Sequence, residues 1–300
     1  MKRDEFGNRM KSQEGRESDR TLIPQLPALA RLDGKCFHSF TKDMERPYDE
    51  RFINLMVATT KWLVEETNAC FGYTQSDEIS LAWYEPDYRS QIFFGGRIMK
   101  MTSVLASMAT LIFNNSLQQF FGEPYGYMLK QKFPLFDCRV WNVPNIDEGA
   151  NVFLWREKDA TRNSIQMAAQ HHYSYKELMN KNTSELQEML FQKGVNWSKY
   201  PSEFKRGTFI QRRKRFDKMT VEDIEKLPEH HEARKNPELN VERTEFRKLE
   251  MPPFGKVLNQ TEVIFFGEDP ITMEAKDYGE DSQSRELADG AEKLNQIMSI

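Results

Sequence analysis

Two short acidic segments contain the residues of this chain that are best suited to chemistry. Asp33 ends an apolar run that begins at Leu26, and Gly34 follows it; Asp77 lies within Gln75–Glu78, between two further apolar runs. Mg²⁺ commonly binds one or two protein carboxylates and completes its coordination with phosphate oxygens and water. The two segments therefore predict metal-dependent chemistry on a phosphorylated substrate.

The two segments are expected to have different backbone shapes. Gly34 is expected to let the chain turn tightly, so that the amides of Lys35, Cys36 and Phe37 point at an anion. Gln75–Glu78 is expected at the tip of a β-hairpin. Most Asp-Gly and Asp-Glu pairs are ordinary turns or solvated surface pairs. A site therefore requires that the two segments meet in space.

The order of the expected elements brings the two acidic segments together. A strand ending at Asp33 is followed by a helix with apolar residues at helical spacing over 52–63, a hairpin over 71–84, a helix over 98–120 and a strand over 133–143. This β-α-β-β-α-β order is the split arrangement of ferredoxin-like folds. The predicted fold class is α+β: a ferredoxin-like or polymerase-palm-like antiparallel sheet with helices, plus a mixed α/β C-terminal region.

The chain divides into three regions by character. We expect a palm-like domain over residues 1–135, a second region over 136–270 and a polar, poorly ordered tail over 271–300 with some helix near 286–298. Further expected elements are helices over Asp4–Gln13, Asn151–Tyr173 and Glu185–Phe191 and a last short strand over Glu262–Phe266.

Composition favours a globular protein of a reducing compartment. The 300 residues are 39% hydrophobic and 29% charged, with a net charge of −4. No apolar run approaches the ~18 residues that span a bilayer, and the polar N-terminus has no signal-peptide character. Cys36, Cys70 and Cys138 are too widely separated for a zinc site or a disulfide framework. We expect a cytoplasmic protein without membrane contact.

One basic segment stands out in the second half of the chain. Lys205–Lys218 holds seven basic residues against one acidic residue, and Phe204, Phe209 and Phe216 lie in or beside it. A local basic run in an acidic protein predicts contact with a polyanion. The alternative is a charged strand that faces water.

The motifs RLDGKCFHSF (31–40) and QSDEIS (75–80), in this order and spacing, resemble the tRNA-His guanylyltransferases and their bacterial, archaeal and phage-encoded relatives, the 3′-to-5′ RNA polymerases. The resemblance extends over about Met1–Pro270. Asp137-Arg139 and Arg206-Gly207-Thr208 support it more weakly. It implies a palm-like nucleotidyltransferase in which the region 136–270 binds tRNA and mediates oligomerisation, often as a homotetramer.

The resemblance also implies site residues and cofactors. Two Mg²⁺ ions would be held by Asp33, Asp77 and the Gly34 carbonyl, with both acids catalytic. Arg46 matches a position near the triphosphate of an activating nucleotide. ATP would activate a tRNA 5′-phosphate, and the 3′-OH of GTP or another NTP would then attack that end. The residues implied to line the nucleotide are Asp33, Gly34, Lys35, Cys36, Phe37, His38, Ser76, Asp77 and Arg46.

One segment departs from the eukaryotic members of the family. Thr161-Arg162-Asn163-Ser164 stands where those members have a His-Ile-Asn-Asn-type motif. This resembles the bacterial and archaeal branch, whose members repair truncated tRNA 5′ ends against a template. We therefore expect template-dependent repair; the alternative within the family is addition of a single 5′ guanosine to tRNA-His. Expected RNA contacts are Arg162, Asn163, Arg206, Arg212, Arg213 and Arg215.

Two alternatives belong to other classes of protein. A nucleotidyl cyclase would share the fold and the metals, but it has no obvious need for the basic segment Lys205–Lys218. A non-catalytic tRNA-binding module would keep that segment and could lose Asp33 or Asp77, and both are present. His38 is assigned to the nucleotide by resemblance, whereas His171 and His172 are expected on the surface or facing RNA.

Overall fold

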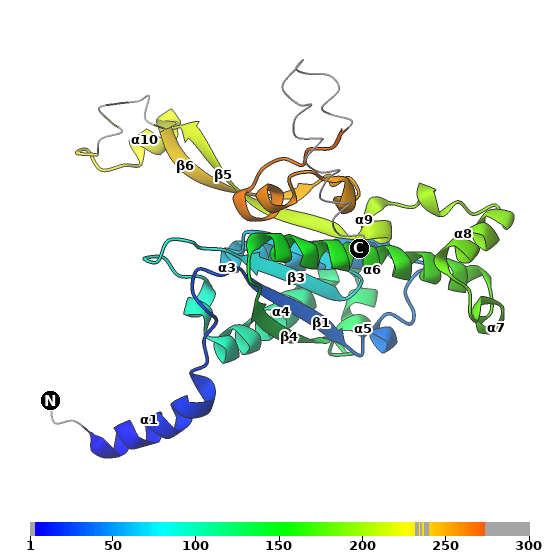
Figure 1. Cartoon of the computed structure of the whole chain (residues 1–300), viewed down its shortest axis with the longest axis horizontal. Helices are drawn as coiled ribbons and strands as arrows, with labels where there is room; N and C mark the ends of the chain where they lie inside the picture. The colour runs from blue at the N-terminus through cyan, green and yellow to red at the C-terminus, as the bar shows by residue number, and fades with distance from the viewer. Residues whose placement is uncertain (1–3, 232–233, 235, 237–239, 274–300) are drawn as a thin grey trace, which may run out of the picture.

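One antiparallel sheet combines strands from both halves of the chain. The computed structural model describes residues 4–231, 234, 236 and 240–273. In this part of the chain the strand order is β4-β1-β3-β2-β5-β6, and each neighbouring pair is antiparallel (Figure 1). The strands are β1 (Ala28–Lys35), β2 (Phe71–Gln75), β3 (Glu78–Trp83), β4 (Leu135–Asn142), β5 (Thr208–Lys218) and β6 (Asn240–Leu249).

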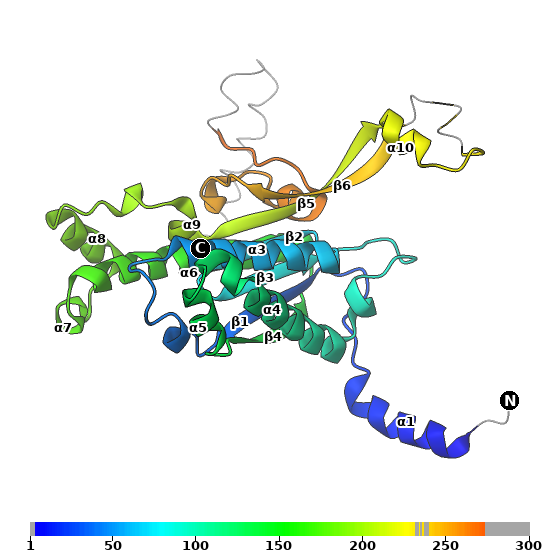
Figure 2. The same ribbon diagram turned by 180° about the vertical axis from the view of Figure 1, so that it is seen from behind.

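Helices lie on both faces of this sheet: α3 and α4 pack on one face and α6 lies across the other (Figures 1 and 2). The described helices are α1 (Glu5–Ser18), α2 (Phe37–Phe40), α3 (Glu50–Thr67), α4 (Ile98–Phe121), α5 (Tyr125–Lys130), α6 (Ile146–His172), α7 (Tyr175–Leu178), α8 (Thr183–Gln192), α9 (Ser202–Arg206) and α10 (Val221–Glu225). Short helical turns are η1 (Phe93–Gly96), η2 (Trp197–Lys199), η3 (Phe254–Lys256) and η4 (Glu262–Phe266).

The first half of the chain has the predicted split topology. Strands β1 to β4 and helices α3 and α4 follow one another as β-α-β-β-α-β, and the strand order β4-β1-β3-β2 leaves β1 beside the β2–β3 hairpin. The helix predicted over 98–120 is α4, and its buried stripe advances in steps of four residues. Its members are Met101, Leu105, Ala109, Phe113, Leu117 and Phe121.

Side chains of β1 alternate between two hydrophobic cores, as a strand requires. Ala30 and Leu32 pack in the core that contains α3 and α4. Leu29 packs in the second core with Phe153 of α6. The same alternation places Arg31 and Asp33 on the α6 side of the sheet, so the catalytic candidates of β1 face α6.

The second half of the chain extends the same sheet. Residues 208–211 of β5 pair with β2, and β5 and β6 then continue as a two-stranded ribbon that projects beyond the helices (Figure 2). This ribbon, residues 212–218 and 240–246, is called the β5–β6 arm below. It contains most of the basic segment predicted to meet a polyanion; Phe204 and Phe209 are buried and Phe216 is exposed.

The prediction of a last strand over Glu262–Phe266 is wrong, because these residues form the helical turn η4. Three consecutive side chains, Val263 to Phe265, are buried in the second core. The Gln211 side chain donates hydrogen bonds to the carbonyls of Val263 and Glu268, both at 2.7 Å. Gly267 ends the turn in the left-handed region, with φ of 77°.

The other expected helices are present with shifted ends: α1 for Asp4–Gln13, α6 for Asn151–Tyr173 and α8 for Glu185–Phe191. Of the predicted tail over 271–300, residues 274–300 lie outside the described residues. The three cysteines are free thiols. In the part of the chain that the structure describes, no helix has the length and apolarity needed to cross a bilayer.

Candidate active site

Asp33 and Asp77, called the acid pair below, come from neighbouring parts of the sheet. Asp33 lies near the end of β1, opposite Glu78 of β3, and Asp77 lies in the two-residue turn between β2 and β3. The Gly34 amide donates a hydrogen bond of 3.1 Å to the Asp77 carbonyl. The convergence required by the sequence analysis is therefore present: β1 and the hairpin tip are joined by a backbone hydrogen bond.

The acid pair has no positive partner among the residues that the structure describes. Burial raises the pKa of Asp77, and the nearby Asp33 charge raises it further. Ser76 donates a hydrogen bond of 3.2 Å to Asp77. Among the described residues, neither acid forms an ion pair with a Lys, Arg or His side chain. Two neighbouring carboxylates without a cation are an arrangement that a bound metal ion would stabilise.

The turn after Asp33 differs from the prediction. Gly34 and Lys35 still belong to β1, and the left-handed residue is Cys36, with φ of 58°. Gly34 is required for space: a Cβ atom there would lie 2.4 Å from the Phe37 ring. Phe37 itself is buried among aromatic rings and anchors the short helix α2. Hence the ring of Phe37, rather than a tight turn at Gly34, selects glycine at this position.

A cavity of about 570 Å³ opens beside Asp77. It lies between the α2 region and the C-terminal half of α6. Arg46 contributes a cation to its wall and donates a hydrogen bond of 3.0 Å to the Thr41 carbonyl. The residues that line the cavity are Phe37, His38, Thr41, Arg46, Pro47, Phe52, Ser76, Asp77, Met167, Gln170 and His171.

The structure thus brings together five of the nine residues expected around the nucleotide, and the other four do not line the cavity. Phe37, His38, Arg46, Ser76 and Asp77 line the cavity. Asp33 and Gly34 lie beside the hairpin tip without lining the cavity, and residues 35 and 36 are exposed. The set is large enough and polar enough to hold a nucleotide beside the acid pair.

The sequence analysis missed the contribution of α6 to this cavity. Met167, Gln170 and His171 lie near the C-terminal end of that 27-residue helix and face the α2 region across the cavity. His171 is exposed, as expected, and it also lines this cavity. The length of the helix was the available signal, because a helix that starts far from the site reaches it about 40 Å later at 1.5 Å per residue.

Glu78, next to Asp77, has a structural partner and does not share the situation of the acid pair. Arg156 of α6 contacts its carboxylate through two hydrogen bonds of 2.6 and 2.8 Å. Burial raises the pKa of Glu78, and Arg156 opposes that effect. Arg156 also bonds Asp159 at 3.1 Å. This network fixes α6 over the start of β3, so α6 restrains the hairpin that contains Asp77.

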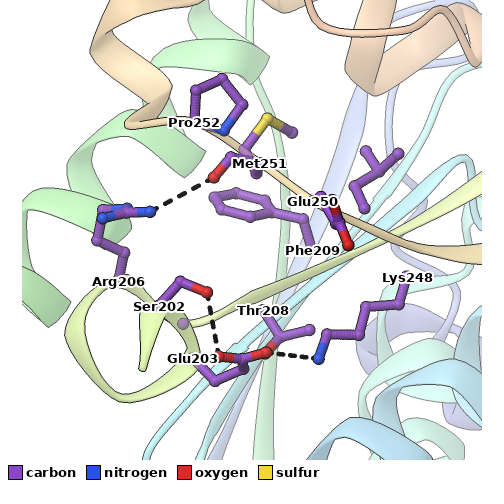
Figure 3. Close-up of a pocket in the computed structure, with 11 residues that line it drawn as sticks. Ser202, Glu203, Arg206, Thr208, Phe209, Lys248, Glu250, Met251 and Pro252 are labelled. Atoms are coloured by element: carbon purple, nitrogen blue, oxygen red, sulfur yellow. Dashed lines mark hydrogen bonds and ion pairs between the residues drawn. The ribbon is translucent and has the colours of Figure 1, made fainter. Parts of the chain in front are cut away.

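A second cavity, of about 550 Å³, lies between α9 and the end of β6 (Figure 3). Arg206, one of the expected RNA contacts, points into it and donates to the Met251 carbonyl at 3.5 Å. Arg206 also lies 3.6 Å from Glu157. Lys248 is paired with Glu203 at 2.6 Å on the opposite wall. Glu203 also lines a smaller pocket that shares Arg46 with the first cavity.

The remaining expected RNA contacts already have partners within the chain. Arg162 and Asn163 both bond Asp159. In the arm, Arg212 bonds Asn68. Partners of the other two arginines are Asp269 for Arg213, at 3.2 Å, and Asp217 for Arg215, at 3.1 Å.

These donors fit Mg²⁺ only if substrate phosphates supply some of its ligands. Among the described residues there is no cluster of three or more His, Cys, Asp or Glu side chains with metal-binding geometry. Mg²⁺, however, usually needs only one or two carboxylates when substrate phosphates supply other ligands. Two carboxylates without a counter-charge beside a cavity with an arginine fit a metal ion that arrives with a nucleotide.

A split βαββαβ sheet with paired acids at the end of its first strand and at its hairpin tip is the architecture of palm-type nucleotidyltransferases. Comparison with known proteins places this chain among them: residues 7–144 match the family model described as tRNAHis guanylyltransferase, Thg1. The chain belongs to this family, and it is a tRNA guanylyltransferase-like nucleotidyltransferase.

Individual relatives agree with the assignment. An uncharacterized protein of Acanthamoeba polyphaga mimivirus is 30% identical over 225 residues, which cover 69% of this chain and 77% of that protein. A bacterial Thg1-like protein in complex with ATP superposes with a TM-score of 0.63 and 33% identity over 69% of this chain and 88% of its own. A bacterial Thg1-like protein in complex with GTP superposes with a TM-score of 0.63 and 30% identity, over 84% of this chain and 95% of its own.

Proposed function

We propose that this enzyme repairs tRNA 5′ ends by template-dependent 3′-to-5′ nucleotide addition. In this proposal ATP activates a 5′-phosphate, and the 3′-OH of an NTP then attacks the activated end. The observation that carries the proposal is the acid pair, which has no cationic partner in the described part of the chain and adjoins a cavity containing Arg46. The substrates fit this site because its carboxylates suit a metal–phosphate complex and its arginine suits a triphosphate.

Each residue of the site has a distinct task. Asp33, Asp77 and the Gly34 carbonyl would hold two Mg²⁺ ions, which supply an activated attacking hydroxyl and neutralise the phosphates and the leaving group. Arg46 balances charge on the triphosphate of the activating nucleotide. Ser76, bonded to Asp77, keeps that carboxylate oriented. His38, Gln170 and His171 form the polar part of the cavity wall.

Template-directed repair is favoured over addition of one fixed guanosine by residues 161–164. Arg162 and Asn163 both bond Asp159, and the buried Ser164 donates to the Lys205 carbonyl at 3.1 Å and accepts from Trp197 at 3.2 Å. These contacts give the segment a structural task within the chain. Pairing with the opposite strand then supplies the sequence information, and the protein needs only shape and backbone contacts.

The test uses a tRNA that lacks its first nucleotide, with the base opposite the gap varied. Incorporation is expected to follow Watson–Crick complementarity and to be independent of the His anticodon. A matched substrate with an intact acceptor end controls for untemplated addition. If only G enters, whatever the opposite base, and only on tRNA-His, the enzyme is a dedicated tRNA-His guanylyltransferase.

A further inference from the structure

Part of the α6 side of the sheet is not covered by any described helix. Helix α6 packs over β2 and β3, where Phe153 lies among Phe71 and Ala82. On β4, by contrast, Leu135, Asp137 and Arg139 alternate as exposed residues. Their partners in β1 include Asp33, opposite Asp137. The uncovered face, residues 135–139 of β4 with 31–33 of β1, therefore begins at the acid pair.

An exposed tryptophan borders this uncovered face. Trp155 projects from α6 with 52% of its surface exposed. Two guanidinium groups lie against its ring, Arg156 at 4.5 Å and Arg31 at 5.7 Å from the ring centre. Residues 153 and 160 of the same helix are buried. Trp155 is thus a large aromatic surface that the helix presents toward β1, and cation–π contacts fix its position.

Two arginines at the uncovered face have N–H groups that donate no hydrogen bond to the described part of the protein. The Arg31 side chain is 22% exposed, and its Nε atom forms one long ion pair, with Glu78 at 3.9 Å. Arg139, directly opposite Arg31 in the sheet, lies 3.6 Å from Asp137. Among the described residues, neither guanidinium donates a hydrogen bond to a protein acceptor. The N–H donors of both guanidinium groups are open to solvent and therefore available to an anionic ligand.

This combination lies close to the acid pair. Arg31 and Asp33 are two residues apart on the same face of β1, which separates their Cα atoms by about 7 Å. An aromatic ring provides a stacking surface for bases, and guanidinium groups bind phosphates through paired donors. The nucleotide cavity lies on the other side of Asp77, between α2 and the end of α6. The acid pair therefore has a nucleotide cavity on one side and the uncovered face on the other.

We propose that Trp155 stacks on the terminal base pair of the RNA acceptor end, while Arg31 and Arg139 contact the phosphates beside it. This inference rests on the proposed 3′-to-5′ addition to RNA, and it adds the surface on which the reacting 5′ end is positioned. An RNA end explains both features, because it offers a flat base pair and phosphates together. A second copy of this chain would need more apolar area than Trp155 and Leu135 expose there.

The experiment measures single-turnover nucleotide addition with the full chain. The acceptor is a tRNA lacking its first nucleotide and carrying a 5′-triphosphate, so that activation is not required. Trp155→Ala is expected to raise the acceptor concentration at half-maximal rate about tenfold or more. Stacking of one base on an aromatic side chain contributes binding free energy of this size. Half-saturation by NTP should be unchanged, and Trp155→Phe should recover much of the loss.

Controls separate stacking from folding and assembly. Tyr175→Ala removes another exposed aromatic side chain, on α7, and is expected to act like wild type. 2-Aminopurine in the terminal base pair should be quenched on binding to wild type and to Trp155→Phe but not to Trp155→Ala. The inference is overturned if Trp155→Ala needs the same acceptor concentration for half-maximal rate as wild type. It is also overturned if weaker acceptor binding is accompanied by a changed sedimentation coefficient, because altered assembly would then explain it. If wild type adds no nucleotide to any acceptor, the proposed function itself has failed.

Discussion

The acid pair and the β5–β6 arm are both rich in charged side chains, but those of the arm form ion pairs and those of the acid pair form none with a described residue. Asp33 and Asp77 lie together, partly buried, without a described cationic partner. In the arm, oppositely charged side chains neutralise one another: Lys214 pairs with Glu242 at 2.9 Å, and Arg215 with Asp217. One region leaves its charge uncompensated, and the other compensates it within the chain.

This difference indicates where ligands matter most. Uncompensated, partly buried charges gain a large amount of free energy from an incoming ion of opposite sign. Exposed charges that already have partners gain little, because a new contact replaces an old one in water. A basic stretch in the sequence is therefore a weaker sign of a binding site than a pair of acids that nothing else neutralises. The predictions below test this ranking.

The largest effect is expected at the acid pair. Asp33→Ala and Asp77→Ala should each lower nucleotide addition by at least ~10³-fold, because charge stabilisation by the metals is the main catalytic contribution. Asp147→Ala is the control, since Asp147 is an exposed carboxylate in the first turn of α6, away from the cavity. Circular dichroism verifies folding. Activity near wild type in a folded Asp33 or Asp77 variant would refute the metal site.

A smaller and selective effect is expected at Arg46. Arg46→Ala should lower addition to a 5′-monophosphate tRNA by about 10- to 100-fold, the range for loss of a charge-assisted hydrogen bond. Addition to a 5′-triphosphate tRNA, which needs no activation, should change much less. Arg46→Lys, which keeps the charge without the planar fork, should fall between. Equal losses on both substrates would remove Arg46 from the activation step.

Metal binding should also appear as stability. In the presence of saturating ATP, Mg²⁺ at ten times its dissociation constant is expected to raise the melting temperature of wild type by a few degrees, because a ligand of the folded state stabilises it by mass action. Asp77→Asn should melt higher than wild type without Mg²⁺, since burial and Asp33 both disfavour the Asp77 charge. It should also lose the Mg²⁺ response. A Mg²⁺ shift that persists in this variant would indicate a different metal site.

The smallest effect is expected in the arm. Replacing Arg212, Arg213 and Arg215 with Ala should flatten the dependence of log affinity on log salt by at most about 0.7 to 0.9 per lost phosphate contact. Because all three have partners in the chain, the loss of tRNA affinity should be only severalfold. An unchanged salt slope would place the RNA elsewhere. A loss comparable to that of Asp33→Ala would reverse the ranking of the two regions.

The sequence was most informative where local rules decide the structure. Helical spacing predicted α3 and α4, and a two-residue turn between apolar runs predicted the hairpin that contains Asp77. Together these elements define the β-α-β-β-α-β order and hence the meeting of Asp33 with Asp77. Local pattern and topology were sufficient for this part because each element has its own periodicity.

The remainder depends on tertiary contacts that no local pattern contains. Glu262–Phe266 has the composition of a strand, but the Gln211 side chain, 51 residues earlier (262 − 211), bonds its backbone and holds a helical turn. The wall formed by Met167 and His171 is set by the length and direction of α6. The partners of the arm arginines come from distant residues such as Asn68 and Asp269.

The pairing of β2 with β5 has a consequence for synthesis of the protein. Thr208, the first residue of β5, emerges 137 residues after Phe71, the first residue of β2 (208 − 71). At about 5–20 residues per second, a ribosome needs roughly 7 to 27 s to make that stretch. During this interval the hairpin that contains Asp77 has one unpaired edge, which can recruit strands of other chains. The cellular yield of this enzyme should therefore depend on how quickly translation proceeds between β2 and β5.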